Sequence, residues 1–288
     1  MAIHPTAIID PKAELDSTVE VGPYCVIEGH VRVAARCRLY QGVYLTGWTT
    51  IGEDSILHPF VIVGHEPQDV KYKGQRTFCR IGRRAVLREH VTVHRGTIPD
   101  SETMVGDDCF LLAGCHVAHN CVVGDNVTLI NNVLLAGHVE VADRVTMGGS
   151  SVAHQFVRIG ELAMLAGKAR VTQDILPFAL VAPGGRIAGL NRVGLRRAGL
   201  TREEFNDIRL AYRILFASGL SLPDAIERMA REVRTEPGKG IVQFLRHTGP
   251  RGLAGRDRRQ PTSAPAADAG GSTSPDLTAD GFGTSPGR

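Results

Sequence analysis

The sequence has few aromatic residues, little net charge and no long apolar run. Phenylalanine, tyrosine and tryptophan make up 5% of the 288 residues, and tryptophan occurs once. The formal net charge of +3 at pH 7 gives no support for binding to nucleic acid. No apolar run approaches the roughly 18 residues that a membrane-spanning helix needs. We therefore expect no nucleic-acid partner, no stable membrane insertion and a core of aliphatic side chains.

The cysteines are few, and all six occupy positions that differ by multiples of six residues: Cys25, Cys37, Cys79, Cys109, Cys115 and Cys121. The last three lie near His116 and His119, which raises the alternative of a zinc cluster. Their spacing follows the repeat described below and matches no known Cys/His ligand pattern, so we expect buried thiols, no metal and no cofactor. Free thiols, and the lack of a basic segment before an apolar one in MAIHPTAIID, predict a cytoplasmic protein.

A repeat of six residues dominates the first part of the chain. In steps of six from Ile3 to Val171, every position is Ile, Leu, Val or Met except Asp69, Gln75, Pro99 and Ala153. A second column, four residues after the first, holds small or medium-sized residues. An α-helix has 3.6 residues per turn and cannot give this period. The period predicts a short strand plus a corner, three of which close an 18-residue triangular coil, as in hexapeptide parallel β-helices.

Two polar stretches, about 64–80 and 96–104, interrupt the pattern but leave its register intact. We interpret them as loops inserted into one continuous mainly-β domain of residues 1–178. The period fails after that, and residues 179–248 are expected to form a small α-helical domain. Residues 249–288 are rich in Gly, Pro, Ser, Asp and Ala, so we expect a disordered tail there.

Helix signals are frequent in the predicted C-terminal domain. Thr201 and Glu204 have the spacing of a capping box, in which each side chain accepts the other residue's backbone N–H. We expect helices over Asn191–Ala198, after Thr201, after Ser221 and near Gly240–His247.

Four of the eleven histidines fall between Leu111 and Gly160: His116, His119, His138 and His154. Residues 18 apart stack in adjacent coils, about 4.8 Å from each other. His119, Gly137 and Gln155 therefore form one column, with the other histidines close by. Imidazole is the usual general base near pH 7, and glycine lets a substrate approach the backbone. Since no serine or cysteine has an obvious nucleophile pattern, we expect direct transfer assisted by a general base.

The chain resembles the acyl-carrier-protein:UDP-N-acetylglucosamine O-acyltransferases, which begin lipid A synthesis. The resemblance covers about Ile3 to His247. It is carried by His4–Ala7, Gln68–Tyr72, Thr92–Gly96, His116–His119, Leu135–His138, His154–Phe156 and Gly194–Arg197.

This resemblance implies a left-handed parallel β-helix, a homotrimer and active sites between subunits. By likeness, His119 is the general base that removes the proton from the glucosamine 3-hydroxyl, and the N–H of Gly137 stabilises the oxyanion. A 3-hydroxyacyl group would come from acyl carrier protein, with Gly167 limiting its length to about fourteen carbons. The remaining implied substrate-binding residues are Asp69, Lys71, His116, His138, His154 and Gln155 for sugar and acyl groups, and Asn191 and Arg197 for the UDP part of UDP-N-acetylglucosamine.

Other functions stay open at this point. One alternative is an enzyme of the same fold that acts on a 3-amino sugar nucleotide or in a later N-acylation step. The family for that later step has an extra N-terminal domain, whereas the repeat here starts at Ile3. A γ-type carbonic anhydrase or a structural rod is the non-transferase alternative. The carbonic anhydrases hold zinc with three histidines, two of them typically five apart, whereas His90/His94 and His116/His119 are four and three apart.

Two positions depart from the family pattern. Asn120 follows the predicted base where an acidic residue is frequent, and Ala198 replaces an arginine often found after Arg197. Acyl carrier proteins are strongly acidic, so outward-facing arginines, Arg83 and Arg84 among them, are expected to dock the donor.

Overall fold

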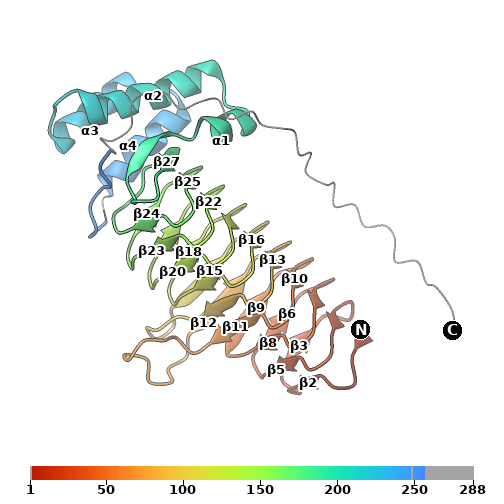
Figure 1. Cartoon of the computed structure of the whole chain (residues 1–288). Helices are drawn as coiled ribbons and strands as arrows, with labels where there is room; N and C mark the ends of the chain where they lie inside the picture. The colour runs from red at the N-terminus through yellow and green to blue at the C-terminus, as the bar shows by residue number, and fades with distance from the viewer. Residues whose placement is uncertain (1, 248, 257–288) are drawn as a thin grey trace. The chain divides into compact units, whose positions relative to one another are not determined.

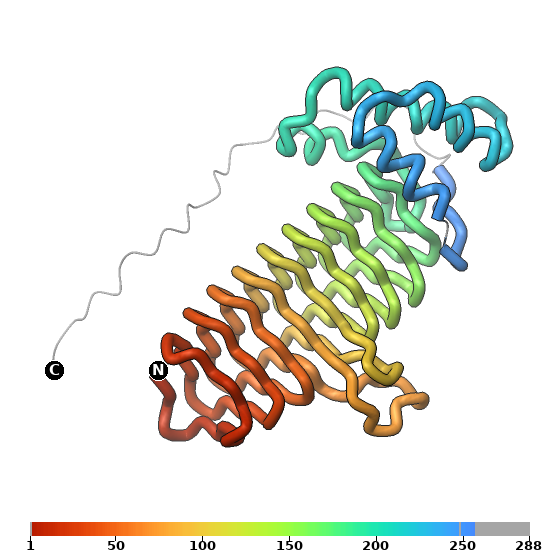
Figure 2. The backbone as a smooth tube through the Cα atoms, turned by 180° about the vertical axis from the view of Figure 1, so that it is seen from behind, coloured from red at the N-terminus to blue at the C-terminus, as the bar shows by residue number. Residues whose placement is uncertain are grey.

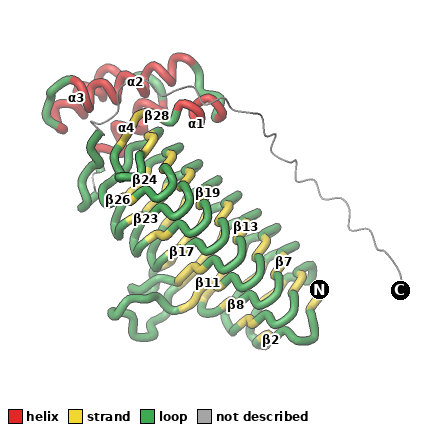
Figure 3. The backbone as a smooth tube through the Cα atoms, viewed as in Figure 1, coloured by secondary structure: helices red, strands yellow, loops and turns green. Residues whose placement is uncertain are grey.

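The computed structural model describes residues 2–247 and 249–256, and its strands form three sheets that run along a coiled rod (Figure 1). From β1 to β26, consecutive strands belong to different sheets, so each sheet receives every third strand. Most of the strands are two residues long and are separated by turns, which Figure 3 shows as short yellow segments in a green backbone. Each set of three strands is one triangular coil.

The first sheet contains β1 (Ala2–Ile3), β4 (Glu20–Val21), β7 (Arg38–Leu39), β10 (Ile56–Leu57), β13 (Val86–Leu87), β16 (Phe110–Leu111), β19 (Thr128–Leu129), β22 (Thr146–Met147), β25 (Met164–Leu165), β27 (Ala179–Val181) and β28 (Ile187–Leu190). The second contains β2 (Ile8–Ile9), β5 (Val26–Ile27), β8 (Tyr44–Leu45), β11 (Ile62–His65), β14 (Thr92–His94), β17 (His116–Val117), β20 (Leu134–Leu135), β23 (Val152–Ala153) and β26 (Arg170–Val171). The third contains β3 (Glu14–Leu15), β6 (Arg32–Val33), β9 (Trp48–Ile51), β12 (Phe78–Ile81), β15 (Glu102–Val105), β18 (Val122–Val123), β21 (Glu140–Val141) and β24 (Arg158–Ile159).

The strand register shows where the longer coils lie. Val117 pairs with Leu135, 18 residues further on, as a regular coil requires. The step is 30 residues from Ile51 to Ile81 and 24 from Ile81 to Val105. Both increments are multiples of six, so the apolar column continues through the two polar stretches. In Figure 2 these stretches leave the rod as orange and yellow loops on one side.

The core is the column formed by the second residue of each two-residue strand, and most of these side chains are fully buried. Ala153, the one gap in the later part of this column, is still buried in β23. The cysteines fill the column of small residues. The Cys109 and Cys121 thiols each donate a hydrogen bond to a carbonyl oxygen of the next coil, at 3.1 Å, and burial raises the pKa of both to about 12. These thiols are therefore protonated packing groups.

The corners of the coil use a left-handed backbone conformation at nearly every sixth residue. Asn120 and His138 have φ values of 60° and 61°, and residues at equivalent corners are similar. Asparagine tolerates this region better than most residues, whereas bulky side chains rarely adopt it. The repeated corner lets three two-residue strands close into one coil.

Four helices follow the sheets in the described residues: α1 (Arg192–Arg197), α2 (Arg202–Ala217), α3 (Leu222–Glu232) and α4 (Glu236–Arg246). The capping box of Thr201 and Glu204 is present, with both reciprocal hydrogen bonds. The last helix begins four residues before the expected position, because Thr235 caps it and a proline occupies its first turn. In the part of the chain that the structure describes, no helix has the length and apolar character needed to cross a membrane.

The division at residues 178 and 248 stays a prediction. The first sheet continues beyond residue 178 through β27, which is parallel to β25, and β28, which is antiparallel to β27. Past residue 248, Leu253 bridges to Asp174, whose buried carboxylate accepts the N–H of Gly249 at 3.1 Å. These residues fall in the segment that we expected to be a tail. The rest of that segment, 257–288, lies outside the described residues.

Candidate functional site

His119 and Asn120 form the corner between β17 and β18, and their contact decides which imidazole nitrogen is free. Nδ1 of His119 lies 3.0 Å from Oδ1 of Asn120, and the backbone N–H of Thr97 donates to the same oxygen at 3.0 Å. A backbone N–H can only donate, so the atom between the two groups is the amide oxygen. Nδ1 of His119 therefore carries a proton in the neutral ring, and the lone pair is on Nε2.

The 96–104 loop and the strand after it hold Asn120 in place. The Asn120 amide nitrogen donates to Oγ of Ser101 at 2.8 Å, and its backbone N–H donates to Oγ1 of Thr103 at 2.7 Å. The sequence marked Asn120 as a departure from a family pattern but gave no sign of these partners. An uncharged amide thus takes the orienting place beside the imidazole.

The 64–80 loop brings Asp69 to the other side of the imidazole. Asp69 Oδ2 lies 3.8 Å from His119 Nε2, beyond hydrogen-bond distance, so Nε2 is not committed to it. The side chains of His119 and Asp69 are 13% and 21% exposed, so both open to the same partly accessible space. The backbone N–H of Lys71 donates to Asp69 Oδ1 at 3.0 Å, which places Lys71 in the same turn.

Gly137 lies directly beside His119 in the next coil, as the 18-residue spacing predicts. A Cβ atom at residue 137 would be 2.5 Å from Cε1 of His119 and 2.6 Å from Nε2. No real Cβ makes contacts this short, so the imidazole fits only because residue 137 is glycine. Within the described chain, the N–H of Gly137 has no hydrogen-bond acceptor, and it is available to a bound group.

His138 continues the cluster on the same corner. Its ring contacts the His119 ring edge-on at 5.2 Å and stacks on Phe156 at 4.7 Å. Burial lowers the pKa of His138, and the nearby His119 and Lys71 lower it further, while Asp69 raises it. His138 is therefore kept neutral beside His119 near pH 7.

The preceding coil holds the His116 ring in place. Its Nδ1 is 2.7 Å from Oγ1 of Thr92, and its ring meets the His94 ring edge-on at 4.8 Å. Burial, followed by the proximity of His119, lowers the pKa of His116. His94 is more deeply buried, its Nδ1 has no partner in the described residues, and burial lowers its pKa to about 4. The sequence gave no reason to choose His94 over the other histidines.

His154 and Gln155 extend the same corner by one further coil. Phe156 N–H donates to the carbonyl of Gly137 at 3.2 Å, which confirms the stacking. The side chains of His154 and Gln155 are both exposed. The backbone carbonyl of Gln155 accepts a hydrogen bond from Arg251 Nε at 2.8 Å. One corner thus carries His119, Gly137, His138, His154 and Gln155 over three coils.

Gly167 lies elsewhere in the protomer. It forms the corner between β25 and β26, at the opposite edge of the second sheet from His119. Gly167 is exposed and stacks on Gly149, whose carbonyl oxygen would be 3.4 Å from a Cβ at residue 167. A single protomer does not bring Gly167 to His119.

Asn191 and Arg197 lie at the start and end of α1. The Asn191 side chain accepts the N–H of Gly194 at 3.0 Å and donates to the carbonyl of Leu162 at 2.9 Å, so it caps the helix and ties it to the third corner of the rod. Arg197 is exposed, and its guanidinium makes no ion pair with any described residue. Of these two side chains, Arg197 is the one without a hydrogen-bond or ion-pair partner among the described residues.

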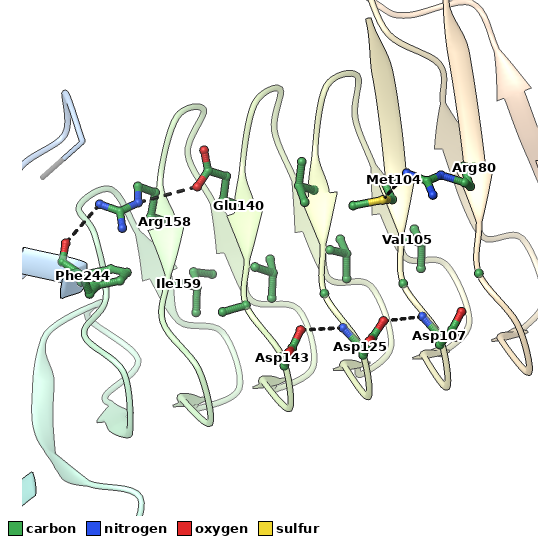
Figure 4. Close-up of a pocket in the computed structure, with 17 residues that line it drawn as sticks. Arg80, Met104, Val105, Asp107, Asp125, Glu140, Asp143, Arg158, Ile159 and Phe244 are labelled. Atoms are coloured by element: carbon green, nitrogen blue, oxygen red, sulfur yellow. Dashed lines mark hydrogen bonds and ion pairs between the residues drawn. The ribbon is translucent and has the colours of Figure 1, made fainter. Parts of the chain in front are cut away.

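A groove of about 590 Å³ runs along the third sheet, away from the histidines (Figure 4). Met104 and Val122 line it, and Arg158 closes one end, with its guanidinium 4.2 Å from the centre of the Phe244 ring. None of the predicted site residues lines this groove. The predicted site residues around His119 lie on the histidine corner instead.

Arg83 and Arg84, which we expected to dock the acidic donor, each have an aspartate partner within the protomer. Each guanidinium donates two hydrogen bonds to an aspartate of the next coil, Asp107 and Asp108 respectively. Their charges are thus largely balanced at the surface. Arg192, Arg196 and Arg197 of α1 are exposed and have no ion pair in the described part of the chain.

Comparison with known proteins decides the family. A family model described as UDP-N-acetylglucosamine O-acyltransferase, domain 2, matches residues 174–254, and one for the bacterial transferase hexapeptide (six repeats) matches residues 102–137. The acyl-(acyl-carrier-protein)–UDP-N-acetylglucosamine O-acyltransferases of Thermodesulfovibrio yellowstonii and Anaeromyxobacter sp. are both 43% identical to the chain. The matches cover 82% and 86% of this chain, and 92% and 98% of those proteins. The chain belongs to this family.

Solved structures of the O-acyltransferase family have the same fold. LpxA from Acinetobacter baumannii superimposes with a TM-score of 0.85 at 35% identity, over 88% of this chain and all of that one. UDP-N-acetylglucosamine acyltransferase from Campylobacter jejuni has a TM-score of 0.83 at 34% identity, with the same coverage. The expected left-handed β-helix followed by helices is confirmed, and the chain is an acyltransferase.

Proposed function

We propose that the chain transfers a 3-hydroxyacyl group from acyl carrier protein to the 3-hydroxyl of UDP-N-acetylglucosamine, the first step of lipid A synthesis. The names of its relatives support the two substrates. The observation that carries the mechanism is the fixed ring of His119, whose Nε2 has a free lone pair beside Asp69.

The proposed reaction is a direct acyl transfer. Nε2 of His119 takes the proton of the 3-hydroxyl as the oxygen attacks the thioester carbonyl, and the carbonyl π electrons move to its oxygen. The N–H of Gly137 donates to this oxyanion. The intermediate then collapses, the C–S bond breaks, and the protonated His119 returns its proton to the carrier's thiolate. An ester and a free thiol result.

The substrate contacts follow the histidine corner. Asp69 and Lys71 approach the acceptor from the loop, while His116 and His138 flank the base and are neutral at pH 7, so they donate or accept hydrogen bonds. Further along the corner, His154 and Gln155 offer exposed polar groups. Asn191 and Arg197 are proposed to hold the UDP part, with the guanidinium suited to phosphate.

We infer a homotrimer whose sites lie between subunits, in the cytoplasm. Gly167 and His119 occupy opposite edges of the second sheet, so a neighbouring copy is needed to bring an acyl groove to the base. Outward residues of that sheet include Ile8, Val26, Ile62, Leu134 and Val152, whereas those of the third sheet include Glu14, Arg32, Arg80, Glu140 and Arg158. The apolar outer face supports burial of the second sheet around a threefold axis.

A transfer assay tests this proposal. Purified protein is incubated with 3-hydroxyacyl carrier protein and UDP-N-acetylglucosamine, and products are identified by mass. We expect one ester product. Parallel reactions with the 3-amino sugar nucleotide and with a glucosamine that already carries a 3-O-acyl group test the other acceptors. A clear preference for either of these would overturn the proposed acceptor.

A further inference from the structure

Arg95, immediately after β14, is the most deeply buried arginine among the described residues, at 7% exposure. Its Nη1 donates to the carbonyl of Gly64 at 2.7 Å, while Nε and Nη2 donate to the Tyr72 hydroxyl at 3.1 and 2.7 Å. The Glu66 carboxylate lies 3.4 Å from Nη2. A buried charge is costly unless it is paired and hydrogen-bonded, and every one of these partners belongs to the 64–80 loop or its start.

The hydroxyl of Tyr72 has its hydrogen-bonding capacity fully used. It accepts the two bonds from Arg95 and donates its own proton to the carbonyl of Gln75 at 3.1 Å. The guanidinium also lies over the Tyr72 ring, 5.2 Å from its centre. The position of this side chain is therefore defined from three sides.

Tyr72 is the last residue of the turn that begins at Asp69. Tyr72 N–H donates to the Asp69 carbonyl at 3.0 Å, and Lys71 N–H donates to the Asp69 carboxylate. The Asp69–Tyr72 turn contains no helix or strand of its own. Its placement 3.8 Å from His119 thus depends on contacts to the rod, and the Arg95–Tyr72 contact joins it to a buried guanidinium.

The rod is shaped to receive this guanidinium. Gly47 and Gly64 both have positive φ, and a Cβ at residue 47 would be 3.1 Å from both Cδ and Nη1 of Arg95. A Cβ at residue 64 would collide with Thr49 at 1.9 Å. Gly47 therefore leaves space beside the guanidinium, and glycine at residue 64 allows the backbone conformation whose carbonyl accepts the Arg95 hydrogen bond.

A second connection joins the same loop to the base. The Gln75 side-chain amide donates to the carbonyl of Thr97, and the N–H of Thr97 donates to Asn120. Asn120 in turn orients His119. The 64–80 loop is thus connected to His119 in two ways. Asp69 approaches the ring directly, and Gln75 is linked to it through Thr97 and Asn120.

We propose that Arg95 and Tyr72 are positioning residues, which hold the Asp69–Tyr72 turn against His119 and thereby set affinity for the sugar-nucleotide acceptor. The inference rests on the proposed function, in which Asp69 and Lys71 meet that acceptor. Neither residue touches the substrate in this scheme. The acyl donor approaches from the neighbouring subunit's groove, so its affinity is independent of the turn.

Steady-state kinetics of Tyr72→Phe and Arg95→Lys separate the two substrates. Tyr72→Phe keeps the ring and removes only the hydroxyl, and Arg95→Lys keeps the charge but loses the two-pronged contact. We expect the KM for UDP-N-acetylglucosamine to rise about tenfold in both, from the loss of a charge-assisted hydrogen bond, with the KM for the acyl donor within about twofold of wild type. Lys73→Gln removes a charge on the same loop, from an exposed side chain that has no hydrogen bond or ion pair with a described residue, so it is the matched control and should match wild type. Equal rises in both KM values would overturn the proposal.

Hydrogen exchange of the full-length protein tests positioning without any substrate. Residues 66–77 should exchange faster in Tyr72→Phe and Arg95→Lys, while residues 102–105 of β15 should be unchanged. Unchanged exchange at 66–77 in both variants would overturn the proposal, as would faster exchange with an unaltered acceptor KM. If wild type transfers nothing to UDP-N-acetylglucosamine, the proposed function fails, and the exchange result still decides whether Arg95 and Tyr72 hold the turn.

Discussion

The imidazole of His119 occupies the space that a side chain on Gly137 would need. The hypothetical Cβ is 2.5 Å from Cε1 of His119, and the two residues lie in adjacent coils of the same corner. Glycine at residue 137 therefore determines where the proposed base sits. It also exposes the N–H that we propose for the oxyanion.

Gly137→Ala is expected to reduce the transfer rate by about 10²-fold or more, because displacing a reacting group by about 1 Å has a cost of that order. The protein should stay folded, since the imidazole can move outward into partly open space. Rates with saturating substrates measure the effect. Gly189→Ala is the control, because a Cβ there meets nothing within 4 Å, and it should leave the rate unchanged. A Gly137→Ala enzyme with the wild-type rate would show that the His119 position is not critical.

Asn120→Asp tests the meaning of the amide beside the base. A carboxylate 3.0 Å from Nδ1 of His119 stabilises the imidazolium, so the acid limb of the rate profile should move to higher pH. Asn120→Ala should instead lower the rate, since the ring loses its fixed orientation. Profiles of kcat/KM between pH 5 and 9 measure both effects. Superimposable profiles for wild type and Asn120→Asp would mean that the side chain at residue 120 does not stabilise the protonated form of the base.

Much of the rod could be predicted from sequence because its buried column repeats every six residues. Each coil needs one large apolar residue per face, so Val117, Leu135 and their equivalents reveal the coil length directly. The same arithmetic placed His119 beside Gly137, which the backbone stacking bears out. Handedness could not be read from the period, and the resemblance to a known family supplied it.

The contacts made by the loops could not be predicted. Asn120 bonds to Thr97 and Ser101, 23 and 19 residues earlier, and Arg95 bonds to Tyr72, 23 residues earlier. No periodicity links such pairs, since they depend on how each loop folds back on the rod. The pairing of Arg83 with Asp107 was missed for a related reason. These residues are 24 apart because their coil is longer, so a search at a spacing of 18 does not align them.

Gly167→Met should shorten the preferred acyl chain. Gly167 and Gly149 leave an open column, and methionine would fill its far end with a flexible side chain. Each buried methylene is worth about 0.8 kcal/mol, so losing several changes relative kcat/KM by orders of magnitude. Competition between 3-hydroxyacyl donors of different length measures the preference, with about fourteen carbons expected for wild type. Identical chain-length profiles for the two proteins would show that Gly167 is not the limit.

His94 should make stability depend on pH. Its pKa is about 4 in the folded protein, against an ordinary value of 6.5, because burial and the neighbouring His116, His65, His119 and Arg95 disfavour its charged form. Between these values the unfolded chain binds a proton that the folded chain does not, so stability is full above pH 6.5 and falls as the pH drops towards 4. The loss attributable to His94 is about 3 kcal/mol.

Urea unfolding at pH 7.5, 6 and 5 tests this dependence. His94→Phe keeps an aromatic ring and cannot titrate, so its stability should fall less steeply with acid than that of wild type. The lowered pKa values of His116 and His138 act in the same direction and remain in both proteins. The same slope in wild type and His94→Phe would contradict a buried neutral His94.

The central claim is that His119 is the general base of acyl transfer, and the rate of His119→Ala tests it most directly. The measurement is transfer from 3-hydroxyacyl carrier protein to UDP-N-acetylglucosamine, made on protein whose unfolding curve and oligomeric state match wild type. Loss of a general base typically lowers the rate by about 10²–10⁴-fold, and we predict a loss in that range. Near-normal turnover by the folded variant would contradict the account.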